Sequence, residues 1–246
     1  MKLYKYSRYS EHLLSTLVKG TVWLSGPQHF NDIFDCQFQR TNLTKQELSE
    51  LRILHKHRNS EFEDQVPLDC IADKSVETPP ANMIDGEYAE ISSFIWRFGI
   101  LTLSEVSDSL LMWAHYAANH TGLCIEYDVE AEADLGNGSL RPVSYSTEYP
   151  TLSIYDFGVD ILKTTLRILT TKSMEWAYEK EWRYFENNKK NTEIPSPFEI
   201  TGVIFGARMK TDQMDTVKKI LKGKDVKFSQ AQQSTTRFSL DRLKVD

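Results

Sequence analysis

The sequence has few cysteines and no long apolar run. Cys36, Cys70 and Cys124 are the only three cysteines, they lie far apart, and no CxxC pair occurs. This pattern predicts neither a disulfide framework nor a cysteine zinc site. No segment approaches the ~20 apolar residues of a membrane span, and the N-terminus "MKLYKYSRYSEHL" lacks a signal-peptide apolar region. We therefore expect a cytoplasmic protein that does not insert into membranes.

Several common catalytic motifs are also missing. The chain contains no glycine-rich phosphate loop, no GxSxG elbow and no recognisable Cys/His nucleophile pair. His115 and His120 are five positions apart, so they do not form the i, i+4 pair of an HExxH zinc site. No metal site is predicted.

Charge is present but unevenly distributed along the 246 residues. The net charge is −6, which argues against general affinity for nucleic-acid backbones. From position 207 onward, however, the charge is about +5, against about −11 for the rest of the chain. A solvated helix face explains this basic region most simply, and binding to a nucleic acid stays open.

Helical and strand patterns are mixed along the chain without strict alternation, which favours an α+β fold. We predict one domain, 1–246, of mainly antiparallel strands with flanking helices and an irregular insertion at 41–80. The expected helices are 10–18, 107–119, 156–170 and 211–222, the first ended by Gly20. The expected strands are 2–6, 21–25, 99–104, 123–128, 141–146, 174–185, 200–209, 226–232 and 237–245.

The stretch "LTLSEVSDSLLMWAHYAANHTG" joins a buried strand to a helix. On that helix Trp113, Tyr116 and His120 have the spacing of one face, with His115 beside them. Trp113 is expected in the core. Core or surface positions and pocket positions both remain open for Tyr116, His115 and His120.

The loop "FNDIFDC" is rich in residues that favour turns. Its default role is structural, through side-chain bonds to the backbone. The alternative is that Asn31 and Asp32 shape the lip of a pocket, anchored by Phe30 and Phe34.

In "MEWAYEKEWRYF", Glu179, Glu181 and Arg183 lie two positions apart. In an extended strand they would share one face. Surface ion pairs are the ordinary explanation and contribute little. The aromatic residues around them favour a pocket instead, because desolvation raises carboxylate pKa values and active sites use this effect.

The ordered stretches "LYKY", "VWLSGPQHFNDIFDC", "LMWAHYAANHTG", "PVSYS" and "EKEWRYF" resemble the bacterial family catalogued as domain of unknown function 2971. The likeness covers nearly the whole chain. Two positions depart from the family pattern: Ile33 stands where the family usually has proline, and Thr102 where it has cysteine.

The layout is also similar to that of compact mono-ADP-ribosyltransferases, which have split sheets. This analogy implies that NAD is the cofactor-like substrate and that Glu179 or Glu181, with Tyr116, is catalytic. It implies a binding role for the first strand and its surroundings, with Arg183 or Lys5 holding the pyrophosphate. The implied binding residues are Tyr4, Lys5, Tyr6, Ser104, Trp113, His115, His120 and Arg183.

Three functional hypotheses follow. The first is an NAD-consuming enzyme, either an ADP-ribosyltransferase with a macromolecular acceptor or an NAD glycohydrolase, acting in stress or phage defence. The second is a non-catalytic module that binds a small nucleotide or a partner protein in such a system. The third is a nucleic-acid-acting toxin component that uses the basic C-terminal region, for which binding to RNA or DNA should depend steeply on salt.

Overall fold

The computed structural model describes residues 1–41, 46–47, 49–50, 92–130, 134–135, 138–153, 156 and 160–245. Most of the predicted insertion at 41–80 therefore lies outside the described residues. Within the described part, the chain forms the predicted α+β fold, and no helix there is long and apolar enough to cross a membrane.

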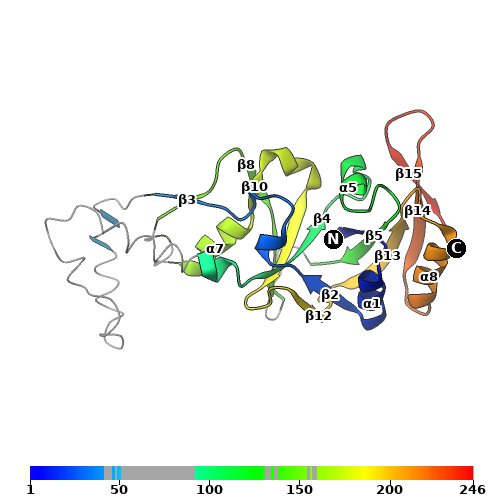
Figure 1. Ribbon diagram of the computed structural model, residues 1–246, viewed down its shortest axis with the longest axis horizontal. Coiled ribbons are helices and arrows are strands. Elements are labelled where there is room, and N and C mark those ends of the chain that lie inside the picture. Colours follow the sequence, from blue (N-terminus) through cyan, green and yellow to red (C-terminus); the bar gives the residue numbers. More distant parts are fainter. Residues whose placement is uncertain are drawn as a thin grey trace.

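A nine-stranded sheet forms the centre of the molecule (Figure 1). Its strands follow the order β15-β14-β13-β5-β1-β4-β11-β7-β6, and all neighbours are antiparallel except β13 and β14. The strands are β1 (Lys2–Ser7), β4 (Gly99–Ser104), β5 (Leu123–Asp128), β6 (Asp134–Leu135), β7 (Gly138–Pro142), β11 (Glu181–Glu186), β13 (Glu199–Phe205), β14 (Lys227–Gln233) and β15 (Leu240–Lys244).

Three two-stranded ladders accompany this sheet. They pair β2 (Thr21–Leu24) with β12 (Thr192–Pro195), β8 (Ser144–Ser146) with β10 (Thr171–Ser173), and β3 (Gln39–Arg40) with β9 (Thr151–Leu152). The β8–β10 and β3–β9 ladders are parallel.

The middle of the large sheet is weakly joined. On one side, β1 pairs with β5 over six residues, but its register with β4 consists of one pair, Tyr4 with Ser104. This one pair still connects β1 to β4, so the nine strands form one sheet. The two separate sheets that the analogy implied are not present among the described residues. We call the junction between β1 and β4 the seam.

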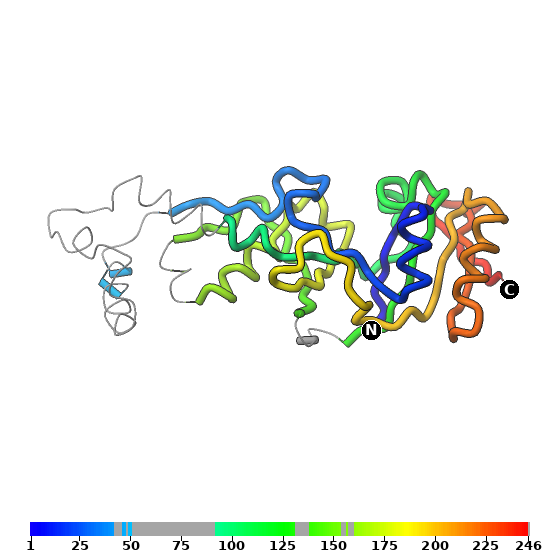
Figure 2. The backbone as a smooth tube through the Cα atoms, turned by 60° about the horizontal axis from the view of Figure 1, so that its bottom comes forward, coloured from blue at the N-terminus to red at the C-terminus, as the bar shows by residue number. Residues whose placement is uncertain are grey.

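One face of the sheet carries the larger core. In β5, which covers the predicted strand 123–128, Leu123, Ile125 and Tyr127 point into this core. The covering elements are α1 (Glu11–Lys19), α8 (Thr211–Ile220) and β2, and Figures 1 and 2 both show α1 beside α8. Leu17 and Val217, one from each helix, are almost fully buried in this core.

Two smaller cores occupy the opposite face. Beneath α5 (Leu110–His115), Tyr6 packs edge-on against Trp113 with ring centroids 5.3 Å apart. Cys124 is buried in the same core. Near α7 (Ile161–Leu169), Phe98 packs against Phe185 with centroids 6.2 Å apart.

The helix ends correct one prediction. The first helix is as predicted, with Ser10 capping it and Gly20 ending it at φ 69°. The predicted helix 107–119 is shorter: Ser109 caps it and it ends at His115. The chain then turns through left-handed backbone at residues 118–120, which breaks the helical repeat. Of the predicted helix 156–170, Asp156 is helical and α7 begins after its cap Asp160, while residues 157–159 lie outside the described residues.

Candidate functional site

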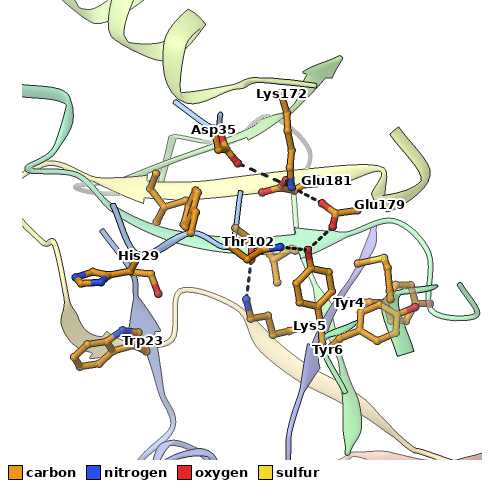
Figure 3. Close-up of a pocket in the computed structure, with 17 residues that line it drawn as sticks. Tyr4, Lys5, Tyr6, Trp23, His29, Asp35, Thr102, Lys172, Glu179 and Glu181 are labelled. Atoms are coloured by element: carbon orange, nitrogen blue, oxygen red, sulfur yellow. Dashed lines mark hydrogen bonds and ion pairs between the residues drawn. The ribbon is translucent and has the colours of Figure 1, made fainter. Parts of the chain in front are cut away.

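A cavity of about 230 Å³ lies at the seam of the sheet (Figure 3). It is lined by β1, β4, the loop after β2, the residues that follow α5, and the carboxylates near residue 180. The lining residues are Tyr4, Lys5, Tyr6, Trp23, Ser25, His29, Phe30, Asn31, Asp35, Ile100, Thr102, Leu103, Met112, Tyr116, Lys172, Glu179 and Glu181.

Glu179 and Glu181 reach the cavity by a route that the sequence did not predict. Residues Met174–Glu179 form a 3-10 helix, η2, rather than a strand, and β11 begins only at Glu181. Lys180 between them has left-handed backbone, with φ 43° and ψ 56°. Because of this turn, Glu179 does not share a strand face with Glu181 and Arg183, yet both carboxylates still point to one place.

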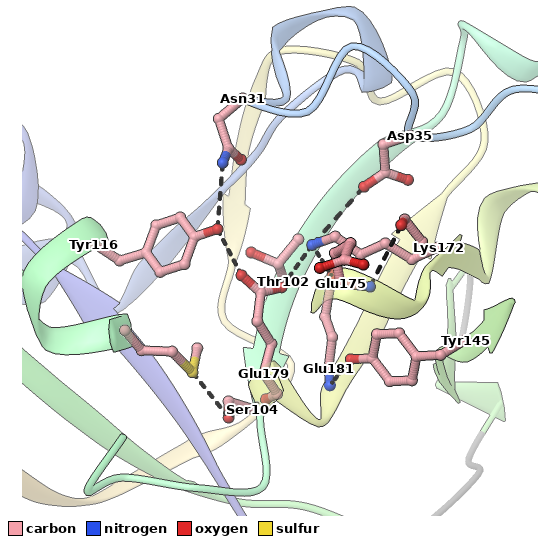
Figure 4. A network of polar contacts seen from close by, with 12 residues as sticks. Asn31, Asp35, Thr102, Ser104, Tyr116, Tyr145, Lys172, Glu175, Glu179 and Glu181 are labelled. Carbon is pink, nitrogen blue, oxygen red and sulfur yellow. Dashed lines mark hydrogen bonds and ion pairs between the residues drawn. The ribbon is translucent and has the colours of Figure 1, made fainter. Parts of the chain in front are cut away.

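Lys172 is the cation that joins the two carboxylates (Figure 4). Its Nζ lies 2.5 Å from Glu179 Oε2 and 2.8 Å from Glu181 Oε2. Asp35 Oδ2 is 4.0 Å from the same nitrogen. Glu179 and Glu181 together raise the pKa of Lys172 against the effect of its burial. The lysine therefore remains charged and fixes both carboxylates.

Arg183 is the second cation of this cluster and contacts two of its carboxylates. Its side chain is fully buried, and it lies 2.7 Å from both Glu181 Oε1 and Asp35 Oδ2. It also donates to the Leu169 carbonyl at 2.6 Å. These groups occupy its guanidinium, and Arg183 does not line the cavity. In this arrangement the Arg183 guanidinium holds the Asp35 and Glu181 carboxylates and does not face the cavity where a pyrophosphate was expected.

The two glutamates differ in their electrostatics. Burial opposes ionisation of Glu181, but Arg183 and Lys172 overcome it and hold the pKa of Glu181 at about 2. For Glu179, burial dominates and raises the pKa, in spite of the contact with Lys172. Glu181 is therefore held in its charged form, while burial makes the charged form of Glu179 less favourable than that of an exposed glutamate.

Tyr116 brings the turn after α5 into the site. Its hydroxyl donates to Glu179 Oε1 at 2.6 Å, and Asn31 Nδ2 lies 3.4 Å from the same hydroxyl. Burial, followed by the contact with Glu179, raises the pKa of Tyr116. Tyr116 is therefore a neutral donor that orients Glu179.

Lys5 crosses the seam. Strand alternation places Lys5 on the same face of β1 as Leu3. Its side chain nevertheless reaches across to β4, where the Nζ donates to Thr102 Oγ1 at 2.8 Å. Among the described residues it has no carboxylate within ion-pair distance, unlike Lys172 and Arg183. Desolvation lowers the pKa of Lys5 to about 8. Lys5 is thus a cation of the cavity that an anionic ligand can approach.

Ser104 lies next to the cavity without lining it. Its hydroxyl donates to the backbone carbonyl of Glu179 at 2.6 Å and accepts the Val106 N–H at 3.0 Å. Ser104 is fully buried. It therefore anchors the end of η2 where Glu179 sits, rather than contacting a ligand.

Three predicted site residues do not face the cavity. Trp113 is fully buried, and its Nε1 donates to the Ser107 carbonyl at 2.9 Å. His120 stacks on Trp113 with ring centroids 6.1 Å apart. His115 is exposed and packs against Trp176, with centroids 6.5 Å apart. The helix ends before these rings can share a face with Tyr116, so they do not wall the cavity.

The loop after β2 contributes differently from its predicted form. Asn31 and Phe30 line the cavity, and Phe30 lies under Arg183, 5.2 Å from its guanidinium carbon. Asp32 instead accepts the Phe34 N–H, and Phe34 is 59% exposed and anchors nothing. The carboxylate that this loop contributes to the site belongs to Asp35, not to Asp32.

The sequence analysis missed several residues of the cavity, among them Trp23 and His29, and it gave no site role to Lys172, Asp35 and Thr102. Each of the last three lies in a segment whose pattern is ordinary: a three-residue strand, a turn-rich loop and a buried strand. The one sequence signal for Lys172 is its place seven residues before Glu179, next to the aromatic-rich stretch. That spacing has no meaning until β10 and η2 fold against each other.

Comparison with known proteins gives a match to one family model. The family model described as "Protein of unknown function (DUF2971)" matches residues 112–184, which hold Tyr116, Lys172, Glu179 and Glu181. This match confirms the predicted resemblance over that segment. No curated protein and no solved structure matches the chain.

Proposed function

We propose that the cavity binds NAD and that the protein cleaves the bond between nicotinamide and ribose. ADP-ribose would pass either to water or to a macromolecular acceptor. The observation that carries this proposal is the contact of Glu179 with both Tyr116 and Lys172 inside a cavity. Such a carboxylate, oriented from two sides, suits chemistry at a sugar carbon.

Cleavage requires stabilisation of positive charge on the ribose. The C1′–N bond breaks with its electron pair going to the nicotinamide nitrogen, and nicotinamide leaves as a neutral molecule. The ribose then has oxocarbenium character, which a carboxylate bound to its 2′-hydroxyl stabilises. The acceptor oxygen forms the new bond at C1′ and gives its proton to Glu179, whose raised pKa suits a general base.

The remaining polar residues would position these groups. Lys172 and Tyr116 would hold Glu179 in its orientation, while Glu181 and Arg183 would hold Lys172. Lys5, which lines the cavity, would bind a phosphate through its ammonium group. The cavity volume is below the ~300–1,000 Å³ of typical ligand pockets, so it would enclose only part of a dinucleotide.

Incubation with NAD tests the proposal directly. The purified protein, with and without cell extract, should release free nicotinamide, and labelled ADP-ribose should appear free or on an acceptor. Glu179→Gln should lower the rate by about 100-fold or more, the range of one general base. Glu175→Gln is the matched control, because Glu175 lies on the same 3-10 helix but is exposed.

Two results would overturn the enzyme. One is an absence of nicotinamide release in both conditions. The other is equal loss of rate in Glu179→Gln and Glu175→Gln. Thermal unfolding should accompany each assay, since a glutamate that is only structural would lower the melting temperature together with the rate.

The second candidate is a non-catalytic nucleotide-binding module, and one observation favours it. Arg183 already pairs with both Glu181 and Asp35, so Glu179 is the carboxylate of the cavity lining that has no arginine partner among the described residues. Calorimetric binding of NAD without any nicotinamide release would support this module over the enzyme.

A further inference from the structure

Trp23 is a large aromatic side chain on the face of β2 that points away from the core, where a polar side chain would be usual. On β2, Val22 and Leu24 point into the large core and are almost fully buried. Strand alternation turns Trp23 to the opposite side, where it is 40% exposed and lines the cavity. The core therefore does not account for this indole.

The surroundings hold Trp23 and its neighbours in place. The His12 ring packs edge-on against the indole, with centroids 5.5 Å apart and an interplanar angle of 86°. Nearby, Asn191 Oδ1 accepts the Gly26 N–H at 3.0 Å, so its Nδ2 faces His29 Nε2, 2.9 Å away. That ring nitrogen of His29 is therefore an acceptor. This end of the cavity is a prearranged aromatic platform.

The platform lies apart from the acidic cluster. Figure 3 shows Trp23 and His29 together at one end, Glu179 and Lys172 at the other, and Lys5 between them. The order along the cavity is thus an aromatic surface, a cation that has no carboxylate within ion-pair distance in the described part of the chain, and then the oriented carboxylate. A dinucleotide presents the matching order of base, phosphates and reacting ribose.

We propose that Trp23 is the stacking platform for the adenine of the bound dinucleotide, with the phosphates at Lys5. This inference rests on the proposed function, because it assigns the opposite end of the same ligand. Every nucleobase has a flat aromatic face, and stacking of one base on one aromatic side chain is favourable enough to measure by substitution.

Calorimetric titration with two probes tests the platform without any turnover. ADP-ribose carries the adenine, whereas nicotinamide mononucleotide lacks it. Trp23→Ala should weaken ADP-ribose binding about 5- to 150-fold, the range for loss of one stacked base. The affinity of the Trp23→Ala variant for nicotinamide mononucleotide should equal that of the wild type. Trp23→Phe should recover part of the loss, since an aromatic face remains.

Trp96→Ala is the matched control. Trp96 is also an exposed tryptophan, at 47%, and it does not line the cavity. Circular dichroism and thermal unfolding should establish that each variant is folded before titration. The conservative Trp23→Phe variant keeps the test decisive if Trp23→Ala unfolds, because it should bind ADP-ribose more tightly than a Trp23→Leu variant.

Three outcomes would overturn the platform: no binding of ADP-ribose by the wild type, equal affinity in wild type and Trp23→Ala, or equal weakening of both probes. Failure of the proposed reaction looks different. If nicotinamide is never released but ADP-ribose binds in a Trp23-dependent way, the reaction is wrong and the platform stands.

Discussion

Arg183 has a fully buried guanidinium between two acidic side chains, Asp35 and Glu181. Removing one member of a buried ion cluster leaves the others without a partner in a medium of low polarity. We expect Arg183→Ala to lower the free energy of unfolding by about 3–5 kcal/mol. Urea titration followed by circular dichroism measures this change.

Arg237→Ala is the control for that measurement, because the Arg237 side chain is 74% exposed and its pair with Asp241 is solvated. It should change stability by less than about 1 kcal/mol. Equal effects of the two substitutions would mean that the buried cluster contributes no more than a surface pair.

Glu181 makes stability depend on acid pH. Its folded pKa is about 2, below its ordinary value of 4.5, because Arg183 and Lys172 outweigh the effect of burial. The unfolded chain therefore binds more protons in this window. The stabilisation is present above pH 4.5 and is lost as the pH falls toward 2.

We therefore expect the wild type to lose more stability between pH 5 and pH 2 than Glu181→Gln, which lacks the titrating group. Urea titrations at pH 5, 4, 3 and 2 measure the two slopes. Parallel slopes would show that Glu181 has the same pKa in the folded and unfolded chains.

Lys5 should make ligand binding depend on alkaline pH. Desolvation holds its pKa at about 8, so the free protein loses this charge as the pH rises above that value. Affinity for ADP-ribose should fall between pH 7 and pH 9.5 in the wild type. Lys5→Arg should keep its affinity over this range, because a guanidinium remains charged. Calorimetry at each pH distinguishes the two, and an equal fall in both would exclude Lys5 as the phosphate partner.

At the scale of elements, Gly20 shows how a single local signal sets a boundary. It ends α1 in left-handed backbone at φ 69°, and a Cβ there would meet nothing within 4 Å. The cost of Gly20→Ala is therefore conformational, and we expect about 1 kcal/mol of destabilisation.

Gly20→Asn is the matched control, because asparagine tolerates left-handed backbone better than alanine does. It should be more stable than Gly20→Ala by a few tenths of a kcal/mol or more, measured by thermal unfolding. A Gly20→Ala variant as stable as the wild type would show that the helix end relaxes to another conformation.

The elements that the sequence predicted well are those with local signals. The end of the first helix at Gly20 and the strand at 123–128 each depend on residues close in sequence. The end of α5 was predicted too late, because the left-handed turn begins at Ala118, a residue type that rarely takes this backbone, although Asn119 and His120 take it more readily.

The candidate site was predictable only in part, for the same reason. Tyr116, Glu179 and Glu181 stand out in aromatic-rich stretches, and all three line the cavity. Lys172 and Asp35 have no such signal, since their importance comes from partners 7 to 148 positions away. Likewise, the left-handed Lys180 that redirects Glu179 lies in a stretch whose alternation looks like a simple strand.

At the scale of the whole molecule, the seam places the cavity where the sheet is least connected. Tyr4 and Ser104 form the one registered pair between β1 and β4, and Lys5 adds a side-chain bond across the seam. A ligand that contacts both strands should therefore slow local opening there.

Hydrogen exchange measures this effect. With saturating ADP-ribose, amides of β1 and β4 near the seam should exchange more slowly, while those of α8, none of whose residues lines the cavity, should not change. Uniform slowing throughout the sheet would indicate global stabilisation, and no slowing at the seam would mean that the ligand binds elsewhere.

The ion cluster around Lys172 also has a consequence for folding. Asp35, Lys172 and Arg183 come from three segments, and 148 positions separate the first from the last. Contacts that span so much chain form late, since they close long loops. During refolding, helical signal should return first and the capacity to bind ADP-ribose last, so ligand capture timed against circular dichroism would date the completion of the native state.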